Sequence, residues 1–380
     1  MKCSGLLLLV ALATALVGCD TIDRDTSRDS YIDLLTQPAE GFQQASPGNR
    51  ITFPRDHGSH PGYSIEWWYL TANLFDDAGR AYGAQWTLFR LAMPRPTDLP
   101  DPLADAGNPW QSSQLFMAHM AVTWPEGHAG FQRYARGGDH GGLVQAGVIT
   151  QPFTARLDDW TMKSTGDDWL PLQVQARQDD MALHLLLTSD QSVVLQGQNG
   201  FSQKHENGGG SHYYSQPFLA AVGEVEIHGE RFAVRGDAWL DHEWSSQLLQ
   251  PDQSGWDWFA LHLESGEKLM LYRLRGAGGS TNYLHGVLLG PGDRRTPLVM
   301  NQIRFRPDQW TQVAGRELPM SWKIELPEIS RRMEVRALHP EQWMGVDFAY
   351  WEGVVTVVGE NPGSRGHGYL EMAGYAAILP

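Results

Sequence analysis

The sequence predicts an all-β protein built from two related antiparallel modules. Short apolar or alternating runs dominate after residue 50, for example at residues 84–89, 181–188 and 353–358. Turns rich in Gly, Pro, Asn and Asp separate these runs about every ten residues, and the chain contains 41 Gly and 22 Pro. Helical periodicity is hard to find in this part of the chain. Such a pattern is typical of antiparallel sheets closed as barrels or sandwiches.

An internal repeat supports the division into two modules. Four weak matches occur in the same order in each half of the chain, and their ranges are 67–69 with 256–259, 118–122 with 284–288, 153–161 with 305–311, and 236–241 with 366–371. The repeat predicts that Trp239 corresponds to Tyr369 and Trp160 to Trp310, with a seam between residues 244 and 256. Residues 93–110, rich in Pro, and 198–216, rich in Gly, lack a counterpart and are predicted to be loops of the first module.

The first residues resemble an export signal that ends in a lipoprotein cleavage box. Lys2 precedes a short apolar stretch, and the sequence Leu-Val-Gly-Cys follows it, ending at Cys19. We expect residues 1–18 to be a signal peptide, Cys19 to carry acyl chains, and residues 19–50 to form a polar tether. The predicted location is the periplasmic side of the bacterial cell envelope, and Asp20 favours the inner membrane. The alternative is an ordinary signal peptide with an incidental cysteine.

Composition and missing motifs exclude several functional classes. The chain has 380 residues and a formal charge of −15 without a basic run, so nucleic acid is not an expected partner. Neither a Gly-x-Ser-x-Gly elbow nor a Walker loop is present. The pairs His57 with His60 and His140 with His205 lack metal-ligand spacing, so the sequence predicts no metal and no cofactor. The 15 Trp leave open the hypothesis that the protein recognises a cell-wall glycan.

The sequence WLDHEW at residues 239–244 is the strongest candidate for a functional motif. In a strand, His242 and Trp244 share one face with Leu240, and Asp241 and Glu243 share the other. In the repeat, Leu370 and Met372 correspond to Leu240 and His242. This correspondence predicts that the face of the strand that carries His242 is apolar. His242 is therefore either a pocket residue or a structural histidine. Asp241 and Glu243 are expected to be solvated or bound to loop amides.

Other candidates lie in aromatic surroundings. Glu66 and Trp68 share one face of the sequence EWWY, where a carboxylate beside tryptophan either acts as an acid or caps a loop. Asp257, between two Trp, raises the same question. The aromatic pair Tyr213 and Tyr214 lies in the Gly-rich loop, which favours ligand binding. His119 lies in an apolar run and is expected to be a core residue.

These motifs resemble the family that joins carotenoid 1,2-hydratases to AttH-like lipocalin proteins. The resemblance covers nearly all of residues 55–380 and is most specific at four motifs, whose ranges are 66–69, 212–215, 238–244 and 350–353. It implies two tandem lipocalin-like antiparallel β-barrels or sandwiches, related by duplication. We expect the first lipocalin-like domain at residues 51–248 and the second at residues 249–380.

The resemblance leads to two hypotheses of function. The first is a membrane-tethered lipoprotein that binds a hydrophobic molecule or lipid, alongside subunits of an ABC-type exporter. The alternative is a cofactor-free hydratase or isomerase of an unsaturated lipid, in which a pocket acid protonates an alkene and aromatic rings shield the cation. The resemblance implies catalytic roles for His242 and Asp257, and ligand contacts from Glu66, Trp68, Tyr213, Tyr214 and Trp244.

Overall fold

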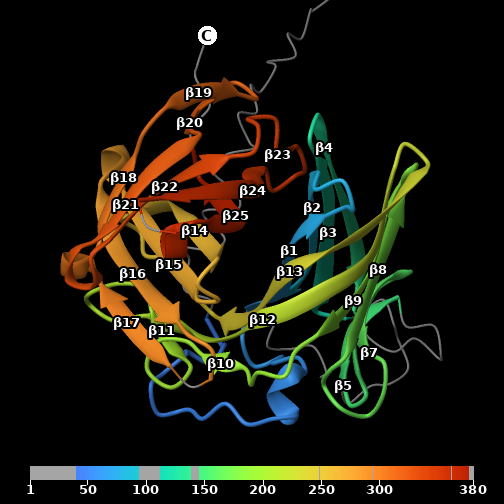
Figure 1. Ribbon diagram of the computed structural model, residues 1–380. Helices are drawn as coiled ribbons and strands as arrows, with labels where there is room; N and C mark the ends of the chain where they lie inside the picture. Colours follow the sequence, from blue (N-terminus) through green and yellow to red (C-terminus); the bar gives the residue numbers. More distant parts are fainter. Residues whose placement is uncertain are drawn as a thin grey trace, which may run out of the picture.

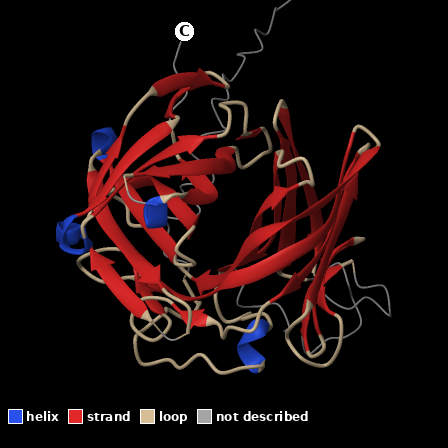
Figure 2. Ribbon diagram, in the orientation of Figure 1, coloured by secondary structure: helices blue, strands red, loops and turns tan. Residues whose placement is uncertain are grey.

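The computed structural model describes residues 40–93, 112–137, 145–247, 249–292, 294–360 and 362–375. Two large curled antiparallel sheets lie side by side and account for most of these residues (Figure 1, Figure 2). The helices in the described ranges are single 3-10 turns, and none of them is long or apolar enough to cross a membrane. The signal peptide, Cys19 and most of the tether lie outside the described residues, as do residues 94–110 of the predicted Pro-rich loop.

The first sheet contains 13 strands within the described residues. Its main path runs β4-β3-β2-β1-β13-β12-β9-β8-β7-β6-β5, and every pair is antiparallel. The 3-10 turn η1 (Arg55–His57) precedes it. The strands are β1 (Ile65–Phe75), β2 (Ala81–Ala92), β3 (Gln114–Trp124), β4 (Gly127–Arg136), β5 (Ala146–Thr150), β6 (Phe153–Leu157), β7 (Trp160–Ser164), β8 (Leu172–Gln178), β9 (Met181–Thr188), β10 (Val194–Leu195), β11 (Phe201–Gln203), β12 (Gly210–Ile227) and β13 (Glu230–Ser245).

The second sheet contains ten strands in the described ranges and repeats the strand order of the first. Its path runs β17-β16-β15-β14-β25-β24-β22-β21-β18. The strands are β14 (Gln253–Leu263), β15 (Lys268–Gly276), β16 (Thr281–Leu289), β17 (Arg295–Val299), β18 (Arg304–Pro307), β21 (Ser321–Leu326), β22 (Arg331–Ala337), β23 (Trp343–Met344), β24 (Tyr350–Gly359) and β25 (Gly366–Ala373); β19 (Trp310–Val313) and β20 (Arg316–Pro319) form a separate hairpin. The 3-10 turns are η3 (Ala277–Gly279), η4 (Met300–Gln302), η5 (Pro327–Ile329) and η6 (Pro362–Ser364).

Side-chain alternation along the central strands explains how the sheets pack. On β1, Trp68 and Leu70 point into the core enclosed by the first sheet, whereas Tyr69 points to the opposite face. That opposite face is covered by the second sheet, where Trp258 and Tyr369 join the same apolar cluster. The molecule therefore has one core inside each sheet and a third between the sheets. Both faces of the central strands are buried.

The register of the strands confirms the internal duplication. Trp239 on β13 pairs with Thr71 on β1, and Tyr369 on β25 pairs with Ala260 on β14. Thr71 lies four residues after Trp67, and Ala260 lies four residues after Trp256, as the repeat requires. The hairpin turns also correspond, because Gly79 and Gly266 both adopt positive φ, of 78° and 80°, two residues after an acidic residue. The two sheets therefore share the same order and register of their central strands.

One pair of residues in the repeat does not correspond in space. Trp160 lies in β7 of the first sheet and is fully buried in its core. Trp310 lies in β19, in the separate hairpin, and is 48% exposed. The prediction that Trp160 corresponds to Trp310 is therefore wrong. Trp310 lies outside the second large sheet, and its ring contacts Tyr375 instead of a sheet core.

Candidate functional site

A cavity of about 80 Å³ lies between the two sheets and is mostly aromatic. Strands β1, β2, β12 and β13 line one side, and β14, β15 and β25 line the other. The space is sufficient for several waters or a small apolar group. Its lining consists of Trp67, Tyr69, Phe89, Lys204, Tyr213, Asp241, Glu243, Leu249, Trp256, Trp258, Tyr272, Leu274, Phe348, Tyr350 and Glu371. A mainly apolar pocket with a few convergent polar groups is the usual form of a small-molecule site.

Two carboxyl groups sit side by side where β25 and β24 meet this cavity. Glu371 is partly exposed toward the cavity, and its direct cross-strand partner is the fully buried Glu352. The Tyr69 hydroxyl donates to Glu352 Oε1 at 2.6 Å, and Trp256 Nε1 donates to Glu371 Oε1 at 2.6 Å. Burial raises the pKa of Glu371 to about 7, and burial together with the charge of Glu371 raises the pKa of Glu352 well above its ordinary value. The pair holds at least one proton at neutral pH.

A third carboxyl group faces the same cavity from the first sheet. Asp241 accepts hydrogen bonds from Ser215, from Tyr213 at 2.6 Å and from Trp239 at 2.6 Å. Burial raises the pKa of Asp241 to about 7 despite these bonds. The register makes Asp241 the counterpart of Glu371, because Asp241 pairs with Tyr69 and Glu371 with Trp258, at equivalent positions of the repeat. The duplication has therefore placed two titratable acids at one interface.

The expectation that Asp241 and Glu243 are solvated or bound to loop amides is wrong. They are 3% and 5% exposed, because the second sheet covers their face of β13. Glu243 pairs with Lys204 at 2.9 Å and accepts a hydrogen bond from Ser211. Lys204 also lies over the rings of Tyr213 and Tyr272, 5.2 and 4.4 Å from their centroids.

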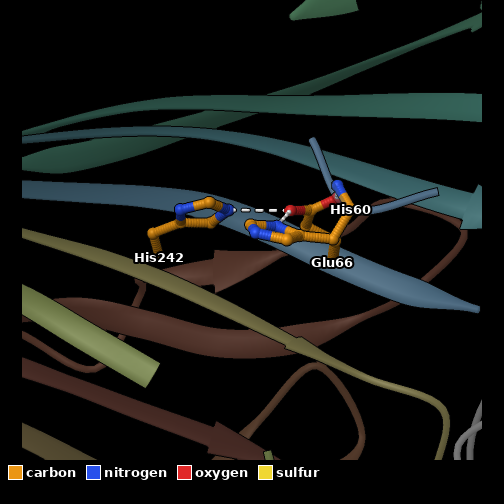
Figure 3. A group of neighbouring side chains, drawn as sticks. All are labelled: His60, Glu66 and His242. Carbon is orange, nitrogen blue, oxygen red and sulfur yellow. Dashed lines mark hydrogen bonds and ion pairs between the residues drawn. The ribbon is translucent and has the colours of Figure 1, made fainter. Parts of the chain in front are cut away.

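The opposite face of β1 and β13 carries a second cluster, made of His60, Glu66 and His242 (Figure 3). His60 lies in the loop between η1 and β1, so its side chain approaches Glu66 from the loop, while His242 approaches from β13. His60 Nδ1 is 2.6 Å and His242 Nε2 is 2.9 Å from Glu66 Oε1. Glu66 Oε2 accepts from Arg90 Nε at 2.6 Å and from the backbone N–H of His60 at 2.9 Å.

The partners of each histidine define its protonation in this cluster. His60 faces a carboxylate at both nitrogens, Glu66 and, at 3.3 Å, Asp56, so it donates at both. Burial acts to lower the pKa of His60, but Glu66 and Asp56 together raise it above its ordinary value. Burial lowers the pKa of His242 to about 4, so this ring is neutral, donates to Glu66 and accepts from Tyr214. Although burial alone would raise it, the charges of Arg90 and His60 hold the pKa of Glu66 well below its usual range.

The residues predicted from sequence are divided between these places. Glu66, Trp68, Tyr214 and His242 meet in the second cluster, where Trp68 stacks on His242 at 4.5 Å and Tyr214 contacts it. Trp244 stacks on His60 at 3.8 Å and lines a polar groove rather than the aromatic cavity. Tyr213 alone among the predicted ligand contacts lines the cavity.

Asp257 belongs to neither place. It is fully buried in an ion pair with Arg273 and Arg275, both at 2.6 Å, and accepts a hydrogen bond from Tyr375. Alternation explains this position, since Asp257 points away from the face of β14 that carries Trp256 and Trp258. An acid held by two arginines is a poor proton donor, so the geometry gives no support to the predicted catalytic role.

Sequence reasoning missed the carboxyl pair and His60. Glu352 and Glu371 both occur in motifs that the repeat or the family resemblance singles out, but neither was assigned a chemical role. A signal existed, because the repeat aligns Asp241 with Glu371 and an acid at both copies of one position is unusual inside a strand. His60 carries no comparable signal, since it precedes β1 in an irregular loop.

Comparison with known proteins identifies the family. The AttH-like family model matches residues 44–375, which is most of the chain. The protein belongs to the AttH-like family. It has no significant match among curated protein sequences.

Solved structures agree with this assignment. A protein assigned as AttH from Nitrosomonas europaea is 30% identical, with a TM-score of 0.74, and the match covers 88% of this chain and all of that one. Kievitone hydratase from Nectria haematococca has a TM-score of 0.62 at 16% identity, covering 90% of this chain and 99% of that one. CghA in complex with Sch210972 has a TM-score of 0.51 at 12% identity, covering 90% and 98%. The last two show that the fold is shared.

Proposed function

We propose that this AttH-like protein is a cofactor-free hydratase or isomerase that acts on an unsaturated apolar molecule in the cavity between the sheets. The observation that carries the proposal is the position of Glu371, a carboxyl group that faces a cavity lined by aromatic rings and whose pKa burial raises to about 7. A general acid works best when its pKa lies near the operating pH. Kievitone hydratase, which shares the fold, adds support for hydration as the reaction.

The geometry suits a reaction through a carbocation. Protonated Glu371 gives its proton to one alkene carbon, and the π electrons form the new C–H bond. The positive charge left on the other carbon lies among rings such as Trp258, Tyr69 and Trp256, whose faces stabilise a cation. Water then adds to this carbon and returns a proton to the carboxylate, which restores the acid. If a neighbouring carbon loses the proton instead, the result is an isomerised alkene.

Glu352 and Asp241 complete this machinery. Glu352 stays protonated beside Glu371. The carboxyl pair therefore loses one proton when Glu371 protonates the alkene and regains one when water adds. Asp241 is fixed by three donors and serves as a second group that can hold a proton when water adds. Lys204 and Glu243 form an ion pair, without net charge, at the wall of the cavity.

A carrier of hydrophobic molecules, the first hypothesis from sequence, would use the same cavity but has no need of these acids. Burying carboxyl groups beside one another costs folding stability, and a carrier would gain nothing in return for that cost. Their presence in an otherwise apolar cavity favours the enzyme over the carrier, and over recognition of a glycan.

Isotope labelling of a lipid extract tests the enzyme directly. The protein is incubated with unsaturated lipids and polyenes in H₂¹⁸O, and products are followed by mass spectrometry. We expect at least one compound to gain labelled water with the native protein, and not with Glu371→Gln, which keeps the shape but cannot donate the proton. Asp159→Asn, on an exposed turn, is the control and should leave the product unchanged. Labelling that continues in Glu371→Gln would assign the chemistry elsewhere.

The tether and its location remain proposals based on the sequence. We propose that Cys19 is acylated and holds the folded part at the periplasmic side of the envelope, with the inner membrane favoured by Asp20. Association with subunits of an ABC-type exporter rests on the family resemblance alone. Cys19→Ser should release the protein from membranes, and unchanged membrane association without a bound acyl chain would contradict the proposal.

A further inference from the structure

We propose that His60, Glu66 and His242 form a binding site for one divalent transition-metal ion of the Zn²⁺ type. Their ligand atoms, Nδ1 of His60, Oε1 of Glu66 and Nε2 of His242, all lie within 4.8 Å of one another. Two imidazoles and one carboxylate are a common ligand set for Zn²⁺ and non-haem Fe²⁺, and three protein ligands leave a coordination position open for water. Figure 3 shows the rings of His60 and His242 beside the carboxylate of Glu66.

Each of the three ligands is already held by an outer partner. His60 Nε2 contacts Asp56 Oδ1 at 3.3 Å, and His242 Nδ1 contacts the Tyr214 hydroxyl at 3.2 Å. Glu66 uses its other oxygen, Oε2, to accept from Arg90 at 2.6 Å, which leaves Oε1 for the ion. Metal-binding histidines and carboxylates are oriented in this way by hydrogen bonds from their second atoms. These contacts therefore fix the three rotamers before an ion arrives.

Only a small movement is needed to admit an ion. The two nitrogens are 2.6 and 2.9 Å from Glu66 Oε1, whereas ligand atoms around tetrahedral zinc are roughly 3.3 Å apart. The contact between His60 and Glu66 must open by about 0.7 Å, which His60 can supply because it lies in a loop and its side chain is 15% exposed. The contact between His242 and Glu66 must open by about 0.4 Å. Binding replaces the proton on His60 Nδ1, and His242 moves its proton to Nδ1, where Tyr214 accepts it. Tyr214 then donates to His57, whose Nδ1 is 2.8 Å away.

The groove beside the cluster gives an ion a route from solvent. This groove is polar, has a volume of about 620 Å³, and includes His60, Asp56, Tyr63, His212 and Trp244 in its walls. Glu66 and His242 lie behind it, fully buried. The proposed ion is bound on the opposite face of β1 from the aromatic cavity, so the proposal does not depend on the proposed hydratase activity.

Metal binding by the untagged, full-length protein tests the proposal. The protein is stripped with a chelator, titrated with Zn²⁺ by calorimetry, and then with Co²⁺, whose visible absorption reports tetrahedral coordination. We expect about one ion per chain and an intense Co²⁺ spectrum. Glu66→Gln and His242→Asn should abolish both signals, and Tyr214→Phe should weaken binding by 10- to 100-fold. His119→Gln is the matched control, since His119 is equally buried and bonded to a tyrosine but lies outside the cluster.

Two results would overturn the proposal. One is binding of less than about a tenth of an ion per chain by the native protein at saturating Zn²⁺. The other is binding that survives unchanged in His60→Ala, a substitution in a loop that is expected to fold even if the strand variants do not. Circular dichroism of each variant separates loss of a ligand from loss of the fold.

Discussion

At the scale of single residues, Glu371 is the group on which the proposed chemistry depends. Its protonated form is the proton donor, and burial raises its pKa to about 7. We therefore expect the rate of the proposed reaction to fall about tenfold for each pH unit above this value. A rate profile measured from pH 5 to 9 tests the assignment. A flat profile up to pH 9 would show that Glu371 is not the donor.

The same pKa makes a prediction about stability. A carboxyl group whose pKa is raised by folding holds its proton in the native state while the unfolded chain has lost it, so stability falls as pH rises from about 4.5 to about 7. Glu371→Gln removes this loss and should stabilise the protein at pH 8 relative to the native chain, by on the order of 3 kcal/mol. Urea unfolding at pH 4.5 and pH 8 measures the difference. Equal stability of the two proteins at pH 8 would contradict a raised pKa.

Glu66 contributes to stability in the opposite sense. It is ionised between Arg90 and His60, so removing it leaves the buried Arg90 without its counterion and leaves His60 with Asp56 alone. Glu66→Met and Arg90→Met should each lower the free energy of unfolding by about 3–5 kcal/mol, whereas the double variant should lower it by less than the sum. Urea unfolding at pH 7 of the two single variants and the double variant gives the coupling. Additive losses would show that the ion pair is not coupled.

At the scale of strands, Gly83 on β2 sets how closely the two sheets approach. A side chain at this position would collide with the Tyr369 hydroxyl and a Val354 methyl group of the second sheet. Gly83→Val should therefore destabilise the protein by about 1–3 kcal/mol. Thermal unfolding measures the effect, and Gly166→Val, in a turn with open space around it, is the control. A loss no greater than that of the control would mean that the sheets can separate without penalty.

Strand-scale patterns also explain how much the sequence could predict. Alternation predicted β1 and β13, and the repeat predicted that Trp239 corresponds to Tyr369. The pairing of Trp239 with Thr71 and of Tyr369 with Ala260 confirms this correspondence. The environment of Asp241 could not be predicted, because a polar residue opposite an apolar face looks the same whether water or a second sheet covers it. His60 was missed for a related reason, since a loop has no period that would direct its side chain toward Glu66.

At the scale of the whole molecule, the second sheet covers one face of the central strands of the first, so both faces of these strands are buried and each carries one candidate site. One face of β1 and β13 carries the cluster of Glu66 and His242 inside the first sheet, and the other carries Tyr69 and Asp241 against the second sheet. Hydrogen bonds cross between the sheets, from Tyr69 to Glu352 and from Asn73 to the backbone of Gly368. Because both sheets line the cavity, the proposed activity requires the two modules together.

The measurement that tests this account most directly is mass spectrometry of apolar molecules retained by the purified protein. We expect the native chain to retain an unsaturated apolar compound that Leu249→Trp, which fills the cavity, does not retain. Arg50→Trp, in the polar groove of the first module, should retain it as the native protein does. Loss of the compound from Arg50→Trp, together with its retention by a folded Leu249→Trp, would contradict the central claim that the ligand site lies between the two sheets.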